Sequence, residues 1–144
     1  MHSRILVVCV GNICRSPLAE HLLRVALPQC QVSSAGVGAV VGADMDTTAR
    51  AVAAERGHTV AVHTARQLTP QLCQEADLIL VMESRHRDAV GQIHAPARGK
   101  TLLLGQGLTP DQIPDPYRKP AAVHAAAQDQ IEQACARWIA RLSR

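Results

Sequence analysis

The stretch that decides the fold is residues 4–17, which read RILVVCVGNICRSP. The run from Ile5 to Val8 is apolar and rich in β-branched residues, which predicts a fully buried strand over Arg4–Cys9. Pro17 suits the first turn of a helix, because its φ is already helical and its missing N–H would have had no partner there. The sequence therefore predicts a strand, a short loop and a helix in direct succession.

Strands alternate with helices along the rest of the chain. We expect strands at 31–35, 77–82 and 101–104, and helices at 16–27, 46–56, 83–90, from 69 and from about 120. This alternation predicts an α/β fold, in which helices cover both faces of a parallel sheet. A length of 144 residues predicts a single domain over 1–144. Ligands of such sheets bind at the carboxyl ends of strands, so the loop after Cys9 is the first place to look.

Composition excludes several classes of protein. Hydrophobic residues make up 47% and charged residues 19%, which excludes a disordered chain. The net charge of +3 and the near absence of aromatic residues argue against nucleic-acid binding. No apolar run reaches the roughly 18 residues of a membrane span, and the N-terminal run is too short for a signal peptide. We therefore expect a cytoplasmic protein.

The cysteines and histidines do not have the spacing of a metal site. The five cysteines are odd in number and contain no C-x-x-C, which predicts free thiols and no structural zinc. Two-metal phosphatases need clusters of Asp and His, and no such cluster is evident. We expect no metal and no cofactor. Six histidines are interpreted as surface or capping residues and three cysteines as buried apolar residues: His21, His58, His63, His86, His94 and His124, and Cys30, Cys73 and Cys135.

Residues 9–16, here called the anion loop, have the skeleton C-x5-R-S. A short loop that enters a helix N-terminus turns successive backbone N–H groups toward one point, which makes a nest for an anion. Gly11 and Asn12 tolerate the left-handed conformation that such a turn needs. Arg15 can hold two phosphoryl oxygens at once. The expected phosphate-binding residues are Val10, Gly11, Asn12, Ile13, Cys14, Arg15 and Ser16.

The position of Cys9, at the start of the anion loop, favours a role as nucleophile. The N–H groups, the helix dipole and Arg15 all favour the thiolate over the thiol, and Ser16 can donate a further hydrogen bond to the sulfur. A thiolate at the centre of a phosphate nest attacks phosphorus. The alternative is that Cys9 is only the last buried residue of a strand. The Gly-Asn inside the loop and the Ser-Pro after it favour the catalytic interpretation.

At this point the chain resembles a known family. The segments VCVGNICRSP at 8–17, SAG at 34–36, DLIL at 77–80 and DPYRK at 115–119 are similar to those of low-molecular-weight protein tyrosine phosphatases, especially the bacterial members associated with capsule and exopolysaccharide export. The resemblance spans nearly the whole chain. It implies a flavodoxin-like three-layer fold with a four-stranded parallel sheet. It also implies a phosphocysteine intermediate and, as partner, a bacterial tyrosine autokinase in exopolysaccharide production.

The resemblance also assigns further site residues. It implies that Asp115 protonates the leaving oxygen and then activates water. It places Ile13, Val40 and Tyr117 at the substrate pocket, although Val40 is equally well explained as a loop residue packed on its own loop. It further implies that Cys14 forms a disulfide with Cys9 that protects the nucleophile, the alternative being a small apolar spacer.

Other functions share this loop. Phosphoarginine phosphatases resemble it but carry Thr in place of Ile13. Arsenate reductases linked to thioredoxin need two further cysteines, and residues 83–100 contain none. A phosphate-binding module without catalysis would need neither Cys9 nor Asp115. The sequence therefore favours a phosphotyrosine phosphatase, with catalytic residues Cys9, Arg15 and Asp115.

Overall fold

The structure is a computed structural model that describes residues 3–143 of the chain. Four parallel strands form one sheet: β1 (Arg4–Cys9), β2 (Gln31–Gly36), β3 (Leu78–Val81) and β4 (Thr101–Leu103), in the order β2-β1-β3-β4. β1 pairs on both sides, so that Cys9 lies opposite Gly36 of β2 and Val8 lies opposite Val81 of β3. The predicted parallel four-stranded sheet is confirmed, and every predicted strand end lies within one residue of the observed one.

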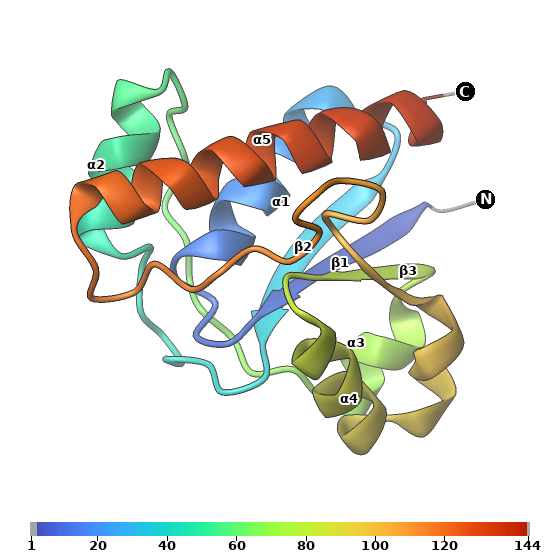
Figure 1. The fold of residues 1–144 in the computed structure, drawn as a ribbon. Coiled ribbons are helices and arrows are strands. Elements are labelled where there is room, and N and C mark those ends of the chain that lie inside the picture. The colour runs from blue at the N-terminus through green and yellow to red at the C-terminus, as the bar shows by residue number, and fades with distance from the viewer. Residues whose placement is uncertain (1–2, 144) are drawn as a thin grey trace.

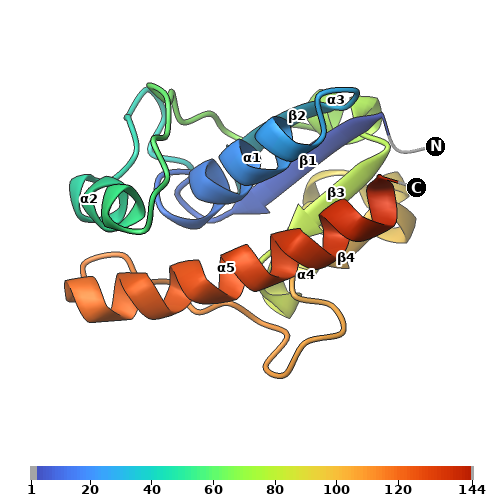
Figure 2. The same ribbon diagram turned by 90° about the horizontal axis from the view of Figure 1, so that it is seen from above.

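Helices cover both faces of the sheet, as Figures 1 and 2 show. One face carries α1 (Arg15–Ala26), α2 (Thr47–Glu55) and α5 (Ala121–Leu142). The other carries α3 (Pro70–Glu75), α4 (Ser84–Ile93) and the 3-10 helix η1 (Ala95–Lys100), which the sequence analysis did not anticipate. Along α5, α1 and α2 are the neighbouring helices. The three-layer α/β arrangement is the expected one.

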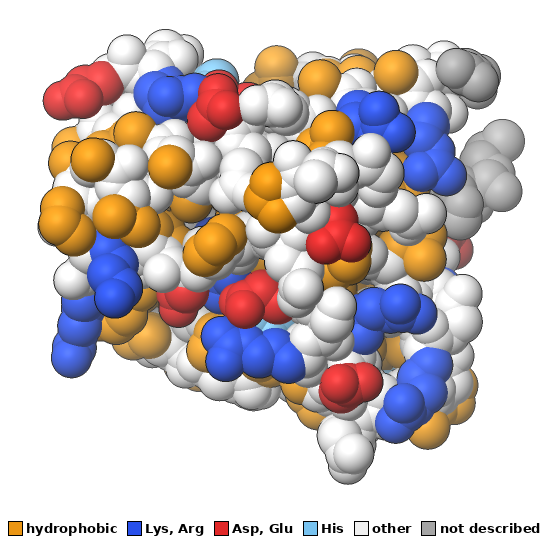
Figure 3. All heavy atoms as spheres, viewed as in Figure 1, with side chains coloured by type: hydrophobic (Ala, Val, Ile, Leu, Met, Phe, Trp, Pro, Cys, Tyr) orange, Lys and Arg blue, Asp and Glu red, His pale blue; other side chains and the backbone are white. Residues whose placement is uncertain are grey.

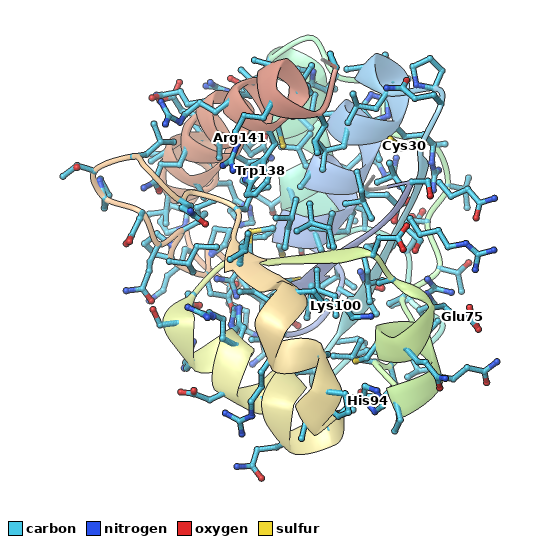
Figure 4. All side chains as sticks on the ribbon, turned by 90° about the vertical axis from the view of Figure 1, so that its right-hand side faces the viewer. Cys30, Glu75, His94, Lys100, Trp138 and Arg141 are labelled. Carbon is cyan, nitrogen blue, oxygen red and sulfur yellow. The ribbon has the colours of Figure 1, made fainter. Side chains whose placement is uncertain are left out.

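The core divides into two apolar layers, one on each side of the sheet. Alternate residues of β1 belong to opposite layers. Ile5 and Val7 lie in the layer with α1 and α5, whereas Leu6 and Val8 lie in the layer with α3 and α4. This is why the strand is apolar at consecutive positions rather than at every second one. On α5, Trp138 donates a hydrogen bond of 2.8 Å from its indole N–H to the carbonyl of Leu104. The guanidinium of Arg141 lies 4.4 Å from the Trp138 ring centre (Figure 4).

The strand order creates a topological switch at the end of β1. From β1 the chain passes to β2 on one side, and after β2 it crosses to β3 on the other side. The connections from β1 to β2 and from β3 to β4 therefore run in opposite directions, which opens a crevice between the carboxyl ends of β1 and β3. The anion loop begins there, at Cys9.

Burial differs from the sequence analysis at three positions. His86 and His124 were expected at the surface or as caps, and each is only 1% exposed. His86 does cap α4, but from a buried position, whereas His124 lies inside α5 and caps nothing. Cys30 was expected to be buried and is half-buried. Within the described part of the chain, no helix is both long enough and apolar enough to cross a membrane.

Candidate active site

The backbone of the anion loop is held from outside. Five consecutive carbonyls, from Cys9 to Ile13, accept hydrogen bonds from other segments. The donors are, in order, the N–H groups of Val37, Gly38 and Val40, the ring Nε2 of His63 and the N–H of Asp46, at 2.7 to 3.0 Å. Because each peptide unit points its carbonyl outward, its N–H group points toward the inside of the loop. The loop is therefore built as an anion nest.

Asn12 fixes the shape of the turn. Its φ is 60°, in the left-handed region, and its side chain is fully buried. The amide donates to the hydroxyls of Ser16 and Ser34 at 2.8 and 2.9 Å, and its oxygen accepts from the N–H of Arg66 at 2.9 Å. Asparagine tolerates this backbone region better than most residues, and the three hydrogen bonds keep it there.

Gly36 lets the next loop approach the anion loop. A Cβ atom at Gly36 would lie only 2.3 Å from the carbonyl oxygen of Val10, which no side chain permits. The close approach brings the segment after β2 near enough to donate to the carbonyls of the anion loop. This position therefore requires glycine for space rather than for an unusual φ.

The sulfur of Cys9 is positioned by Ser16. The Sγ and Oγ atoms are 2.9 Å apart, and both residues are buried. Because Asn12 already donates to the Ser16 oxygen, the hydroxyl hydrogen is left to point at the sulfur. Cys14, the N-cap of α1, makes no side-chain hydrogen bond to the first turn, so the helix N-terminus keeps its N–H groups for an anion.

Arg15 is buried, and two hydrogen bonds fix the orientation of its guanidinium. It is 1% exposed, and its Nη1 donates to Glu83 at 2.6 Å and to the carbonyl of Ile113 at 2.7 Å. Its Nε has no hydrogen-bond partner among residues 3–143, and its Nη2 lies 3.8 Å from a carboxylate oxygen of Asp115. The Nε–Nη2 edge of the guanidinium is thus the edge left to bind two oxygens of a phosphoryl group.

Glu83 orients Arg15, a role that no sequence pattern predicted. Burial alone would raise the pKa of its carboxyl group, but the hydrogen bond from Arg15 and the charge of that guanidinium outweigh this, so the pKa is lowered. Glu83 stays ionised at neutral pH and partners a cation that would otherwise be buried alone. From the sequence, Glu83 was expected only as the first residue of the helix at 83–90.

His86 completes this support from α4. Its Nδ1 accepts from the N–H of Glu83 at 3.2 Å, and the carboxylate of Glu83 accepts in return from the N–H of His86, which forms a capping box. Burial, together with the charge of Arg15, lowers the pKa of His86 to about 4. The ring is therefore neutral at pH 7 and accepts a hydrogen bond as a cap.

This lowered pKa predicts a pH dependence of stability. The unfolded chain binds the proton of this histidine near pH 6.5 and the folded protein only near pH 4, so stability is lost as the pH falls between these values. The gap corresponds to about 3 kcal/mol of unfolding free energy. His86→Gln keeps a capping side chain that does not titrate, and we expect the variant to lack this loss. Urea unfolding of both proteins at pH 7, 5.5 and 4 measures it, and parallel curves would contradict the assignment.

Asp115 lies at the mouth of the anion loop. One oxygen of its carboxylate accepts the N–H of Tyr117 at 3.0 Å, and the other faces Arg15. A cavity of about 140 Å³ lies between these groups. Its lining includes Cys9, Ile13 and Arg15 of the anion loop, together with Val40, Asp115 and Tyr117. The structure thus brings the three expected catalytic residues and the three expected pocket residues to one place.

Comparison with known proteins identifies this arrangement. Residues 4–144 match the family model for low molecular weight phosphotyrosine protein phosphatase. The chain belongs to that family. It is therefore a protein-tyrosine phosphatase, a phosphoric monoester hydrolase that acts on phosphotyrosine proteins.

Individual relatives agree with the family. The chain is 46% identical over 143 residues to the low molecular weight protein-tyrosine-phosphatase Wzb of Escherichia coli strain K12, covering 99% of this chain and 97% of Wzb. The crystal structure of Wzb from Escherichia coli K30 in complex with sulphate has a TM-score of 0.96 at 43% identity, over 99% of each chain. The YwlE arginine phosphatase of Geobacillus stearothermophilus is also similar, with a TM-score of 0.89 at 37% identity, over 97% of this chain and 92% of YwlE.

Cys14 of this phosphatase is a buried free thiol. Burial raises its pKa strongly, and the negative charges of Asp46 and Asp115 raise it further. The thiol is therefore protonated at neutral pH, which lowers its intrinsic reactivity toward oxidants. The disulfide with Cys9 that the resemblance implies stays a prediction.

The phosphatase has a larger cavity away from this site. It measures about 470 Å³, begins at Arg4 and Ile5, and is lined in part by Cys30 and Glu75, which are labelled in Figure 4. It contains no residue of the anion loop, so its size does not make it the catalytic pocket.

On the face seen in Figure 3, acidic and basic side chains are interspersed rather than gathered into a patch of one sign.

Proposed function

We propose that this phosphatase hydrolyses phosphotyrosine through a phosphocysteine formed on Cys9. The observation that supports this most strongly is the set of five outward carbonyls, because it directs the N–H groups of the anion loop toward a point next to a cysteine sulfur. Arg15 offers a free guanidinium edge to the same point. A site for a tetrahedral dianion with a thiolate beneath it favours transfer of the phosphoryl group to sulfur.

In the first step, the thiolate of Cys9 attacks phosphorus. The S–P bond forms as the bond from phosphorus to the tyrosine oxygen breaks, and Asp115 gives its proton to that oxygen. The amides of the anion loop and the guanidinium of Arg15 stabilise the negative charge on the three equatorial oxygens. Glu83 acts as a positioning residue, since it holds the other edge of Arg15 and does not face the substrate.

In the second step, water replaces the thiolate. Asp115, now a carboxylate, accepts a proton from the water that attacks phosphorus, and the S–P bond breaks to release phosphate and the thiolate. The Ser16 hydroxyl stabilises the sulfur as the leaving group. No step needs a metal or a cofactor.

The walls of the cavity favour an aromatic substrate over phosphoarginine. Ile13 presents an apolar branched side chain, and the aromatic ring of Tyr117 lines the same cavity. A guanidinium substrate would leave its N–H groups facing this apolar wall, which is costly. The arginine phosphatase among the similar structures shares the fold at a lower identity than Wzb does.

A pair of peptides tests this function. Phosphotyrosine and phosphoarginine are placed in the same peptide sequence, and we expect kcat/KM to favour phosphotyrosine by about 10²-fold. Rapid acid quench with labelled phosphotyrosine peptide should trap label on the tryptic peptide that contains Cys9. Equal rates for the two peptides, or label on another residue, would overturn the proposal.

We also propose a bacterial tyrosine autokinase of exopolysaccharide or capsule production as the partner, and the cytoplasm as the location. Arg118 and Lys119 are exposed next to Tyr117, so a multiply phosphorylated tyrosine-rich tail would be attracted to this side of the pocket. A thiolate nucleophile needs a reducing compartment, which suits the buried free thiols of Cys9 and Cys14. A tail peptide with several phosphotyrosines should lose kcat/KM with added salt more steeply than a singly phosphorylated one.

Val40 offers little contact area for a substrate ring on one wall of the cavity. It is 46% exposed and aliphatic, so it offers little surface for a phenyl ring. Val40→Tyr should lower KM for phosphotyrosine peptides by about 3- to 10-fold through ring contact, with kcat nearly unchanged. Val41→Tyr, at the more exposed neighbouring position outside the cavity, is the control. An unchanged KM would show that Val40 does not face the ring.

A further inference from the structure

Three groups able to bind a metal meet next to the anion loop. The sulfur of Cys14, a carboxylate oxygen of Asp46 and a ring nitrogen of His124 all lie within 4.8 Å of one another. They come from three segments: Cys14 is the N-cap of α1, Asp46 is the N-cap of α2, and His124 is in the first turns of α5. Their separations in sequence are far larger than those of zinc motifs, which is why spacing alone predicted no such site.

His124 is the group that points to a ligand. It is 1% exposed, and neither of its ring nitrogens has a hydrogen-bond partner among residues 3–143. A buried imidazole without partners loses the hydrogen bonds that it makes to water, and natural proteins rarely leave such a group unsatisfied. A metal bound to one nitrogen supplies one of the two missing partners.

Asp46 is held in place with one oxygen to spare. Its backbone N–H donates to the carbonyl of Ile13 at 2.9 Å, and its Oδ2 accepts from the N–H of Ala49 at 3.0 Å as the cap of α2. Its other oxygen is not used by the cap. The residue is thus rigidly placed next to Cys14 and can still act as a ligand.

We propose that Cys14, Asp46 and His124 bind one Zn²⁺, with water as the fourth ligand. A thiolate, an imidazole and a carboxylate form a donor set that zinc prefers, whereas Mg²⁺ and Ca²⁺ prefer oxygen alone. Tetrahedral bonds of about 2.0 to 2.3 Å place ligand atoms about 3.5 Å apart, and the three ligand atoms here lie within 4.8 Å of one another, so the side chains close around the ion as it binds.

Binding of Zn²⁺ releases one proton and leaves the site without net charge. Cys14 releases its thiol proton to solvent as the S–Zn bond forms, His124 binds as the neutral imidazole, and Asp46 binds as the carboxylate. The two negative ligands neutralise the charge of the ion. The bound metal would fasten the anion loop to the N-terminal ends of α2 and α5. Cys14 belongs to the anion loop, but its sulfur takes no part in either phosphoryl-transfer step, so the proposal does not depend on the proposed function.

Cobalt spectroscopy tests the sulfur ligand. The Cys9→Ser protein is used throughout, because the nucleophile is itself a thiol that could bind metal. We expect one equivalent of Co²⁺ to give a near-ultraviolet thiolate-to-metal band and the visible bands of a tetrahedral ion, both displaced by Zn²⁺. Adding Cys14→Ser should abolish the thiolate band. Adding Cys73→Ser, a free and buried cysteine on the opposite side of the sheet, should leave it unchanged.

Zinc affinity tests the histidine. In the same Cys9→Ser protein, His124→Gln should weaken Zn²⁺ binding by at least about 100-fold, because loss of a direct ligand costs at least as much as loss of an outer-shell partner. His94→Gln, at the C-cap of α4 on the other face of the sheet (Figure 4), is the matched control and should not change the affinity. Phosphate binding by each variant shows that the anion loop is folded.

A labelling experiment needs no change at the site. Zn²⁺ should slow the alkylation of Cys14 in the Cys9→Ser protein at least tenfold and leave that of Cys30 unchanged, as read by mass spectrometry. The proposal is overturned if Zn²⁺ does not bind with one-to-one saturation, if the thiolate band survives in Cys14→Ser, or if Cys14 is not protected.

Discussion

Cys9→Ser is expected to lose turnover of phosphotyrosine by at least about 10⁴-fold while still binding phosphate. The serine hydroxyl does not ionise near neutral pH, so the nucleophile disappears. The outward carbonyls of the anion loop and the buried Arg15 do not depend on the sulfur, so the binding site for the oxyanion remains. Steady-state assay with a phosphotyrosine peptide measures the first effect, and calorimetry with inorganic phosphate or orthovanadate measures the second.

The control for this variant is Cys73→Ser. Cys73 is also a buried free cysteine, but it lies in the apolar layer on the far side of the sheet. It should retain the turnover of the parent protein. Turnover near the parent level in Cys9→Ser would remove Cys9 from the nucleophilic role.

The second large effect concerns Asp115→Asn. An amide cannot donate the proton that the tyrosine oxygen needs as it leaves, so kcat for phosphotyrosine peptides should fall by about 10²- to 10⁴-fold. An aryl phosphate with a strongly acidic phenol leaves without that proton. Its rate of phosphoryl transfer to Cys9 should therefore fall much less, which single-turnover kinetics can resolve for a series of phenols.

Asp111→Asn is the matched control for Asp115, because it is an exposed aspartate in the same loop that does not line the cavity. It should leave every rate close to that of the parent. If Asp115→Asn slowed good and poor leaving groups equally, the carboxyl group would be acting on something other than the leaving oxygen.

The strands and the anion loop could be predicted because their signals are local. The apolar run before Cys9 reaches both core layers, so consecutive branched residues reveal a central strand without any knowledge of its neighbours. The start of α1, two residues before Pro17, and the left-handed Asn12 are also decided within a few residues. Such features depend on backbone preferences that a sequence shows directly.

The residues that support the site could not be predicted in the same way. Glu83 holds Arg15 from 68 positions away, and His63 holds the carbonyl of Asn12 from 51 positions away. The burial of His124 depends on how α5 lies against α1 and α2, which no local pattern decides. Gly36 looks like any glycine at a strand end until the carbonyl of Val10 is seen to approach it. These are contacts that only the assembled fold defines.

The outward carbonyls of the anion loop have a consequence for how activity is acquired. Their donors come from 37–40, 46 and 63, three stretches that follow β2 and reach the loop only when this part of the chain has taken its final place. A partly assembled protein with the first strand and helix in contact would carry the nucleophile but not the shape around it. Catalysis should therefore emerge late and all at once during refolding, which makes enzyme activity a sensitive measure of the fully assembled molecule.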